Sequence, residues 1–149
     1  MAEIVGLRLE DIDLERAVVQ IRPNHARRLK TPGSTRCLPL VGVAHTAIQK
    51  ISSGVESEWL LPQYIKEDSC KATHASNALN KWLKAEFDGL TAHCLRHTIR
   101  DRLRAVECPG EIIDQIGGWS SHKSVGSSYG HGYSVEQVGV WLKLIGVEC

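Results

Sequence analysis

The feature that most restricts the fold of this sequence is a change of hydrophobic pattern near residue 40. Before that point, residues 17–21 (AVVQI) and 35–40 (TRCLPL) form short apolar runs that are typical of strands. The stretch between them is polar and contains the turn-favouring residues Pro23, Asn24, Pro32 and Gly33. After that point, apolar residues recur with helical spacing. The pattern therefore predicts a β-hairpin over residues 17–40, with a long basic tip, followed by mainly helical chain.

The helical part divides into amphipathic segments whose apolar residues share one face. They cover residues 43–53, 73–87, 92–106, 109–117 and 134–145. Two stripes are expected to face the core: Ala75, Leu79, Trp82, Leu83 and Phe87 in one segment, and Leu95, Ile99, Leu103 and Val106 in the next. Ser134 with Gln137 resembles a capping box at the start of the last segment. A short apolar run at 59–62 predicts a third strand or a buried turn, and residues 2–5 predict the end of a helix stopped at Gly6.

Length and composition are those of an ordinary soluble domain. The chain has 149 residues, of which 42% are apolar and 23% charged, which excludes a disordered tail and a disulfide miniprotein. Its five cysteines form no CxxC pair, so a zinc ribbon is not supported and free thiols are expected. No apolar run approaches a membrane span, and the first residues lack a signal peptide. The sequence thus predicts a cytoplasmic α+β protein, a mainly helical single domain over residues 1–149 with a small antiparallel sheet.

Charge is distributed unevenly although the formal total is only +1. Residues 1–15 contain five acids and one arginine, whereas residues 22–36 contain five basic residues and no acid. Residues 93–104 contain four arginines and one aspartate. The near-neutral sum, taken alone, argues against a nucleic-acid partner, but it arises by cancellation between separate segments. Basic charge on the hairpin tip and one helix is compatible with DNA binding or with an ordinary solvated surface.

The segment HCLRH at 93–97 has the clearest chemical content. His93 and Arg96 lie three residues apart, so they share one face of the predicted helix. Arginine offers a planar fork of donors to a phosphate, and histidine exchanges a proton near neutral pH. Together they suit catalysis on a phosphodiester. His93 and His97 also have the spacing of two metal ligands, but the metalloprotease pattern requires Glu where Cys94 stands.

Two of the three tyrosines lie in a segment rich in Gly, Ser and His, residues 118–133. Tyr129 and Tyr133 are surrounded there by small and polar residues, unlike tyrosines of a core. Taken alone, this placement fits exposed surface tyrosines of a loop better than a nucleophile.

In chain order, these pieces resemble the catalytic domain of the tyrosine recombinase, or phage integrase, family. Residues 3–13 look like the family's opening helix and turn, and the basic hairpin with Lys30 looks like its lysine-bearing β-hairpin. The motif His93-x-x-Arg96-His97 is similar to the family's His-x-x-Arg-His signature. Gly118-Trp119 stands where the family has Gly-His or Gly-Trp, and Tyr129 follows Trp119 near the spacing of the nucleophile.

The resemblance implies cleavage and rejoining of double-stranded DNA through a 3′-phosphotyrosyl intermediate, with neither a metal nor another cofactor. Tyr129 would be the nucleophile, with Tyr133 as the alternative. His93 would accept the phenolic proton, and Arg96 would stabilise the charge that develops on the phosphate. The remaining implied roles are proton donation to the departing 5′-oxygen by Lys30, support by the indole N–H of Trp119, support of Arg96 by His97, and DNA contacts by Arg27, Arg28, Arg36 and Arg100.

One part of the family pattern has no match in this chain. The family's first catalytic arginine stands three residues before the position of Glu3, which falls just before Met1. The N-terminal core-binding domain also has no counterpart, so the resemblance implies an N-terminally truncated catalytic domain that is inactive alone. The loss of one fixed phosphate-binding charge lowers the rate roughly a thousandfold.

Two other functions remain open. One is a non-catalytic, DNA-binding remnant of an integrase, which would bind DNA without forming an adduct. The other is an interaction module in which the last helix docks on a neighbouring protomer through Val138, Trp141, Leu142 and Ile145. The same four residues equally fit a helix packed in its own core. The family assembles as a tetrameric synapse on DNA, so a homo-oligomer of bacterial or phage origin is implied.

Overall fold

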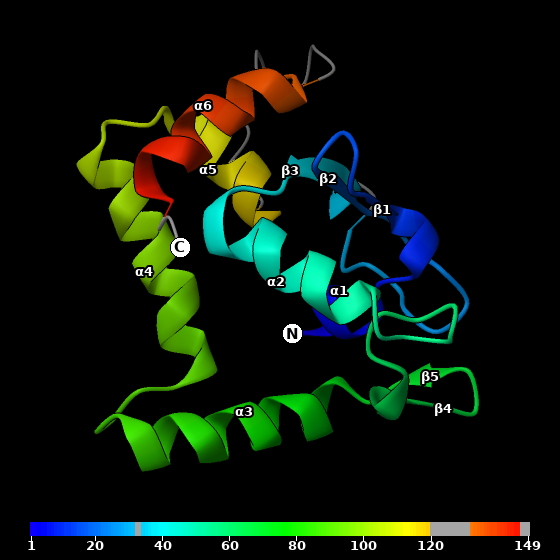
Figure 1. Cartoon of the computed structure of the whole chain (residues 1–149). Helices are drawn as coiled ribbons and strands as arrows, with labels where there is room; N and C mark the ends of the chain where they lie inside the picture. The colour runs from blue at the N-terminus through cyan, green and yellow to red at the C-terminus, as the bar shows by residue number, and fades with distance from the viewer. Residues whose placement is uncertain (32–33, 120–131, 147–149) are drawn as a thin grey trace.

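The computed structural model describes residues 1–31, 34–119 and 132–146 (Figure 1). Helix α1 (Ala2–Val5) leads through a 3-10 turn at Leu9–Asp11 into strands β1 (Ile12–Asp13), β2 (Val18–Ile21) and β3 (Arg36–Pro39). Helix α2 (Gly42–Ser52) follows, then a 3-10 turn at Pro62–Tyr64 and the small hairpin of β4 (Ile65–Lys66) and β5 (Ser69–Cys70). The remaining helices are α3 (Ala72–Glu86), α4 (Ala92–Ala105), α5 (Gly110–Gly117) and α6 (Val135–Ile145). The mainly helical α+β architecture predicted from the hydrophobic pattern is confirmed.

The hairpin predicted over residues 17–40 forms the centre of an antiparallel sheet ordered β1-β2-β3. Val19 pairs with Leu38 on one side and with Ile12 on the other. Strand β1 was not predicted, because two residues carry too short an alternation to be recognised. The run at 59–62 forms no named strand, but Trp59 makes an isolated antiparallel bridge with Arg8.

Two apolar clusters hold these elements together. The first lies under the sheet and includes Leu7, Val19 and Leu60. The second joins α4, α5 and α6 and consists of Leu103, Cys108, Ile112, Ile113, Ile116, Val138, Leu142 and Ile145. Helix α6 lies beside α5 and packs on β3 (Figure 1). Its apolar stripe is therefore buried in its own domain, and docking of that stripe on a neighbour does not fit the structure.

The stripes predicted for α3 and α4 are only partly buried. Helix α3 buries Ala75 and Leu83 but leaves Trp82 and Phe87 about half exposed. Helix α4 buries Leu103, whereas Leu95 and Ile99 remain exposed. The reason is visible in Figure 1: α3 and the first half of α4 lie away from α5 and α6, so only the second half of α4 reaches the helical core. Periodicity marks the apolar face of a helix, but the neighbouring elements decide how much of that face is covered.

Helix ends follow their local chemistry. The capping box predicted for α6 is present, because Ser134 Oγ accepts from Gln137 N and Gln137 Oε1 accepts from Ser134 N. Helix α5 ends at Gly118, whose φ of 61° lies in the left-handed region that glycine adopts without strain. Within the described residues, no helix is long and apolar enough to cross a membrane. The cysteines at 37, 70, 94 and 108 are free thiols.

Candidate active site

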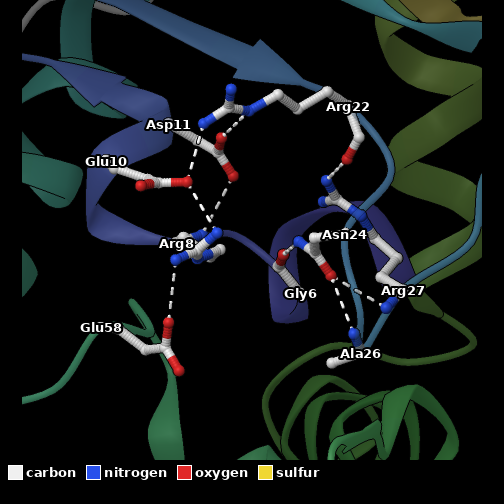
Figure 2. Close-up of polar contacts among 9 residues, drawn as sticks. All are labelled: Gly6, Arg8, Glu10, Asp11, Arg22, Asn24, Ala26, Arg27 and Glu58. Atoms are coloured by element: carbon white, nitrogen blue, oxygen red, sulfur yellow. Dashed lines mark hydrogen bonds and ion pairs between the residues drawn. The ribbon is translucent and has the colours of Figure 1, made fainter.

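The polar segment between β2 and β3 folds back against α1 (Figure 2). Asn24 organises this turn: its Oδ1 accepts from the backbone N–H of Ala26 at 3.2 Å and of Arg27 at 2.9 Å. Its Nδ2 donates to the carbonyl of Gly6 at 2.9 Å. The carbonyl of Ala26 accepts from Cys70 N at 3.1 Å. The first half of the hairpin tip is thus tied to two other elements, which fixes the path toward Lys30.

Arg27 lies inside this turn and is only 3% exposed. Its Nη1 donates to the carbonyl of Glu3 at 2.5 Å, and its Nη2 donates to the carbonyl of Arg22. A Cβ at Gly6 would lie 2.9 Å from the Arg27 side chain, so glycine allows this approach. The expectation that Arg27 contacts DNA does not fit this placement, because its donors point inward to backbone carbonyls.

The acidic N-terminal stretch pairs with basic residues of the hairpin (Figure 2). Arg22 Nε donates to Asp11 Oδ1 at 2.5 Å, and Arg22 Nη2 lies 2.9 Å from Glu10 Oε1. Arg8 completes the group with ion pairs to Glu10 at 2.7 Å and to Glu58 at 3.0 Å. The Asp11 carboxylate is fully buried, so its pairing with Arg22 satisfies a charge that would otherwise be costly.

Beyond this turn, a cleft of about 340 Å³ brings together residues from three distant parts of the chain. It is lined by Lys30, Thr31, Ser34, Arg96, Arg100, Asp114, Gly118 and Trp119. Three cationic side chains and one carboxylate share this small space, which makes it suitable for an anion such as a phosphodiester. Lys30, Arg96, Arg100 and Trp119 are all candidates identified from the sequence, and the structure places them together.

Trp119 packs against the two arginines of the cleft. The guanidinium carbons of Arg96 and Arg100 lie 4.8 Å and 5.0 Å from the centre of its ring, within the range of cation–π attraction. Arg96 Nη2 also donates to the carbonyl of Gly117 at 3.0 Å, and Arg100 Nη2 lies 3.9 Å from Asp114 Oδ1. These contacts restrain the two guanidiniums and leave further donors of Arg96 for a ligand.

The two histidines of the motif lie near the cleft but do not line it. His93 occupies the first turn of α4, and its ring meets that of His97 edge-on with 4.6 Å between centres. Both side chains are exposed. Among the described residues, no group of three or more His, Cys, Asp or Glu gathers as a metal site.

Arg36 is the second arginine whose predicted DNA contact does not fit the structure. Its side chain is 7% exposed, and its fork bonds the Glu3 carboxylate with Nη1–Oε1 at 3.0 Å and Nη2–Oε2 at 2.9 Å. Burial by itself raises the pKa of Glu3, but the hydrogen bond and charge of Arg36, with the charge of Arg96, bring the pKa below its ordinary value. Sequence reasoning missed this pair, because the partners are 33 residues apart and share no local pattern. Of the predicted DNA-contacting arginines in the hairpin, Arg28 alone is exposed.

The two candidate nucleophiles are Tyr129 and Tyr133. Tyr129 lies outside the described residues. Tyr133 precedes α6, and its hydroxyl donates to Glu111 Oε2 at 2.8 Å. This hydrogen bond, with burial and the charge of Glu111, raises the pKa of Tyr133. Neither Tyr133 nor Glu111 is among the residues that line the cleft. The hydroxyl of Tyr133 is thus engaged by Glu111 outside the cleft lining, and Tyr133 stays the alternative nucleophile.

Comparisons with known proteins agree with this architecture. The family model described as "Phage integrase family" matches residues 1–135. The structure of one variant of the Tn1549 transposon integrase with a circular intermediate DNA has a TM-score of 0.63 and 17% identity, covering 94% of this chain and 53% of that chain. A variant of the same integrase with transposon right end DNA has a TM-score of 0.62 and 19% identity, covering 95% and 53%.

This chain therefore spans about half the length of the solved integrases it matches. At these identities, the structural likeness establishes the fold alone. No curated protein sequence matches the chain. The family model, which covers most of the sequence, settles the assignment: the chain belongs to the phage integrase family.

Proposed function

We propose that this chain is the catalytic domain of a tyrosine-type site-specific recombinase, which cleaves and rejoins double-stranded DNA. The observation that carries the proposal is the cleft in which Lys30, Arg96 and Trp119 meet. Each comes from a separate segment that the family resemblance singles out. Membership of the integrase family supports the same reaction. The solved integrases of similar fold are complexes with DNA, which supports DNA as the partner.

The proposed reaction exchanges one phosphoester for another. The phenolic oxygen of Tyr129 attacks the scissile phosphorus, a P–O bond to tyrosine forms, and the bond to the 5′-oxygen breaks. Covalent capture keeps the phosphoester, so the free 5′-hydroxyl can reverse the reaction without ATP. A free tyrosine has a pKa of about 10, so removal of its proton needs help. His93 receives that proton, and Lys30 protonates the departing 5′-oxygen.

The role of Arg96 in the proposed reaction is electrostatic stabilisation of the transition state. Negative charge grows on the nonbridging oxygens of the phosphate in the transition state, and a guanidinium binds two such oxygens at once. The bond from Arg96 to Gly117 and the ring of Trp119 hold that guanidinium at the cleft, which reduces the reorganisation required during reaction. Trp119 donates a hydrogen bond but cannot shuttle a proton, so its role is support. The role implied for His97 is support of Arg96, and its ring also lies edge-on to that of His93.

The test is formation of a covalent adduct on DNA. The DNA site is not specified by the sequence, so the probe is a pool of randomised duplexes, each carrying a nick that traps the cleaved state. We would use the chain as it stands and a version extended at its N-terminus by a helix carrying the family's first arginine. A denaturation-resistant adduct, lost in Arg96→Ala, supports the proposal. Retarded duplexes without adduct in both versions would instead support the non-catalytic DNA-binding remnant.

The choice of nucleophile is tested with two single substitutions in the adduct-forming version. We expect Tyr129→Phe to abolish the adduct. Tyr133→Phe should retain it, because the hydroxyl of Tyr133 is engaged by Glu111. Adduct formed by Tyr129→Phe but not by Tyr133→Phe would overturn the assignment.

We also propose that the protein acts as a homo-oligomer on DNA, as a tetrameric synapse. The inner stripe of α6 is occupied in its own core, but the outer face of this helix leaves Val140 and Leu144 about 60% exposed. Light scattering with and without duplex DNA tests this idea. A monomeric mass at every concentration, with DNA present, would refute it.

A further inference from the structure

Arg36 lies where three elements around the cleft meet. Its Nη1 donates to the carbonyl of Ser34 at 2.8 Å, and its Nε donates to the carbonyl of Ile116 at 3.2 Å. Its Nη1 and Nη2 together also hold the Glu3 carboxylate on α1. One buried guanidinium thus joins α1, the turn before β3 and the last turn of α5. Ser34 lines the cleft itself, so this junction forms part of the cleft wall.

The turn that ends α5 rests directly on this guanidinium. A Cβ at Gly118 would lie 2.5 Å from Arg36 Nη1 and 2.8 Å from its Cζ, so backbone and guanidinium are in close contact. The residue after this glycine is Trp119, which packs against Arg96. Two guanidiniums therefore meet the end of α5, Arg36 at the carbonyl of Ile116 and Arg96 at that of Gly117. Cations at this position also complement the negative end of the helix dipole.

We propose that Arg36 is a positioning residue of the cleft: held by Glu3, its guanidinium fixes the Gly118–Trp119 turn and thereby the placement of Trp119 against the cleft arginines. This inference rests on the proposed function only in treating the cleft as the site of a phosphodiester. Lysine cannot substitute for Arg36, because one ammonium on a flexible stem does not bridge a carboxylate and two carbonyls as a planar fork does. The role differs from the DNA contact predicted from the sequence, since here Arg36 acts through the turn.

The experiment follows the indole N–H resonances of the chain, which contains four tryptophans. Trp119→Phe identifies the resonance of Trp119, and the other three indoles report whether each variant remains folded. Inorganic phosphate is titrated at constant ionic strength as the probe of the cleft. The variants are Arg36→Gln and Arg36→Lys, with Arg28→Gln as the matched control, because Arg28 belongs to the same basic segment but is exposed.

We expect Arg36→Gln and Arg36→Lys both to move the Trp119 resonance in the absence of phosphate and to weaken phosphate binding roughly tenfold. Arg28→Gln should leave that resonance in place. The salt dependence of binding to a duplex provides a second readout. Arg28→Gln should reduce its slope by about one, as for a lost phosphate contact, whereas Arg36→Gln should not.

Several results would overturn the proposal. They are an unmoved Trp119 resonance in Arg36→Gln, full rescue by Arg36→Lys, or a salt slope reduced by about one in Arg36→Gln. If Arg36→Gln does not fold, Glu3→Gln takes its place, because it removes the charge that holds Arg36 and should move the Trp119 resonance in the same direction. If phosphate leaves Trp119 unaffected in the unaltered chain, the phosphodiester role of the cleft fails, while the phosphate-free resonance still tests the positioning role.

Discussion

Replacing Arg27 by glutamine separates its structural role from the DNA contact predicted for it. The side chain is 3% exposed and donates to the carbonyl of Arg22 (Figure 2) and to that of Glu3, so it joins α1 to the turn after β2. Burial lowers the pKa of the Arg27 guanidinium, which reflects the cost of removing this charge from water. Glutamine is shorter and cannot reach both carbonyls from the same backbone position.

The magnitude follows from the two bonds and the burial. A hydrogen bond from a charged group contributes about 1.5–3 kcal/mol, and the desolvation of the guanidinium offsets part of this sum. Truncation also leaves two partly buried carbonyls without that donor, at up to about 1–3 kcal/mol each. We therefore expect Arg27→Gln to lower the free energy of unfolding by about 3 kcal/mol. For a chain of this size, that change corresponds to roughly 6–12 °C in Tm.

The assay is urea denaturation followed by circular dichroism, with Arg28→Gln as the control. The exposed control should stay within about 0.5 kcal/mol of the unaltered chain. Binding of a short duplex at several salt concentrations complements it, and Arg27→Gln should leave the slope unchanged while Arg28→Gln lowers it by about one. The reasoning is refuted if Arg27→Gln unfolds like the unaltered chain and loses a unit of salt slope, because Arg27 would then be a phosphate contact.

Three further outcomes follow from the described contacts. The folded-state pKa of Glu3 lies below its ordinary value, so the ionised Glu3 stabilises the fold above about pH 4.5. This stabilisation is lost as the pH falls through the folded-state pKa. Glu3→Gln should therefore reduce the fall of the free energy of unfolding at acid pH, measured by denaturation at several pH values. Gly118→Ala should lower the free energy of unfolding by about 1–2 kcal/mol in thermal denaturation, because φ at Gly118 is 61° and the turn contacts a guanidinium. The control Gly110→Ala has open space around the new Cβ, so it should be neutral or slightly stabilising. Gln115→Leu should cost about 1–3 kcal/mol by the same measurement, because Gln115 bonds both the N–H and the carbonyl of Tyr133 at 2.8 Å.

Local patterns in the sequence account for most of the fold. The hairpin, the helices after it and the Ser134 capping box each arise from neighbouring residues, so periodicity and turn chemistry suffice to predict them. Burial along α3 and α4 could not be predicted in the same way. Trp82 and Ile99 have the spacing of core residues, yet they stay exposed because the neighbouring elements leave that part of each helix uncovered. Burial depends on contacts between distant elements, which no local window contains.

The candidate site shows the same difference between what local sequence patterns predict and what depends on contacts between distant elements. Motif resemblance was sufficient to select Lys30, Arg96 and Trp119, which the fold brings into one cleft. It also grouped Arg27 and Arg36 with the DNA-contacting residues, because a basic run gives no sign of which side chains turn inward. That distinction depends on acids and carbonyls contributed by α1 and α5, far away in the sequence.

The pairing of charges explains how a chain with a formal charge of only +1 can present a basic cleft. Three of the five acids in the first fifteen residues are directed at specific partners: Glu10 and Asp11 at Arg22, and Glu3 at Arg36. Each of these carboxylates is thereby paired with a guanidinium, and none of the three is among the residues that line the cleft. Within the described cleft, Asp114 is the one carboxylate beside Lys30 and the two arginines. The pairing of these acids with arginines that do not line the cleft, more than an excess of basic residues overall, therefore leaves the cleft its positive charge.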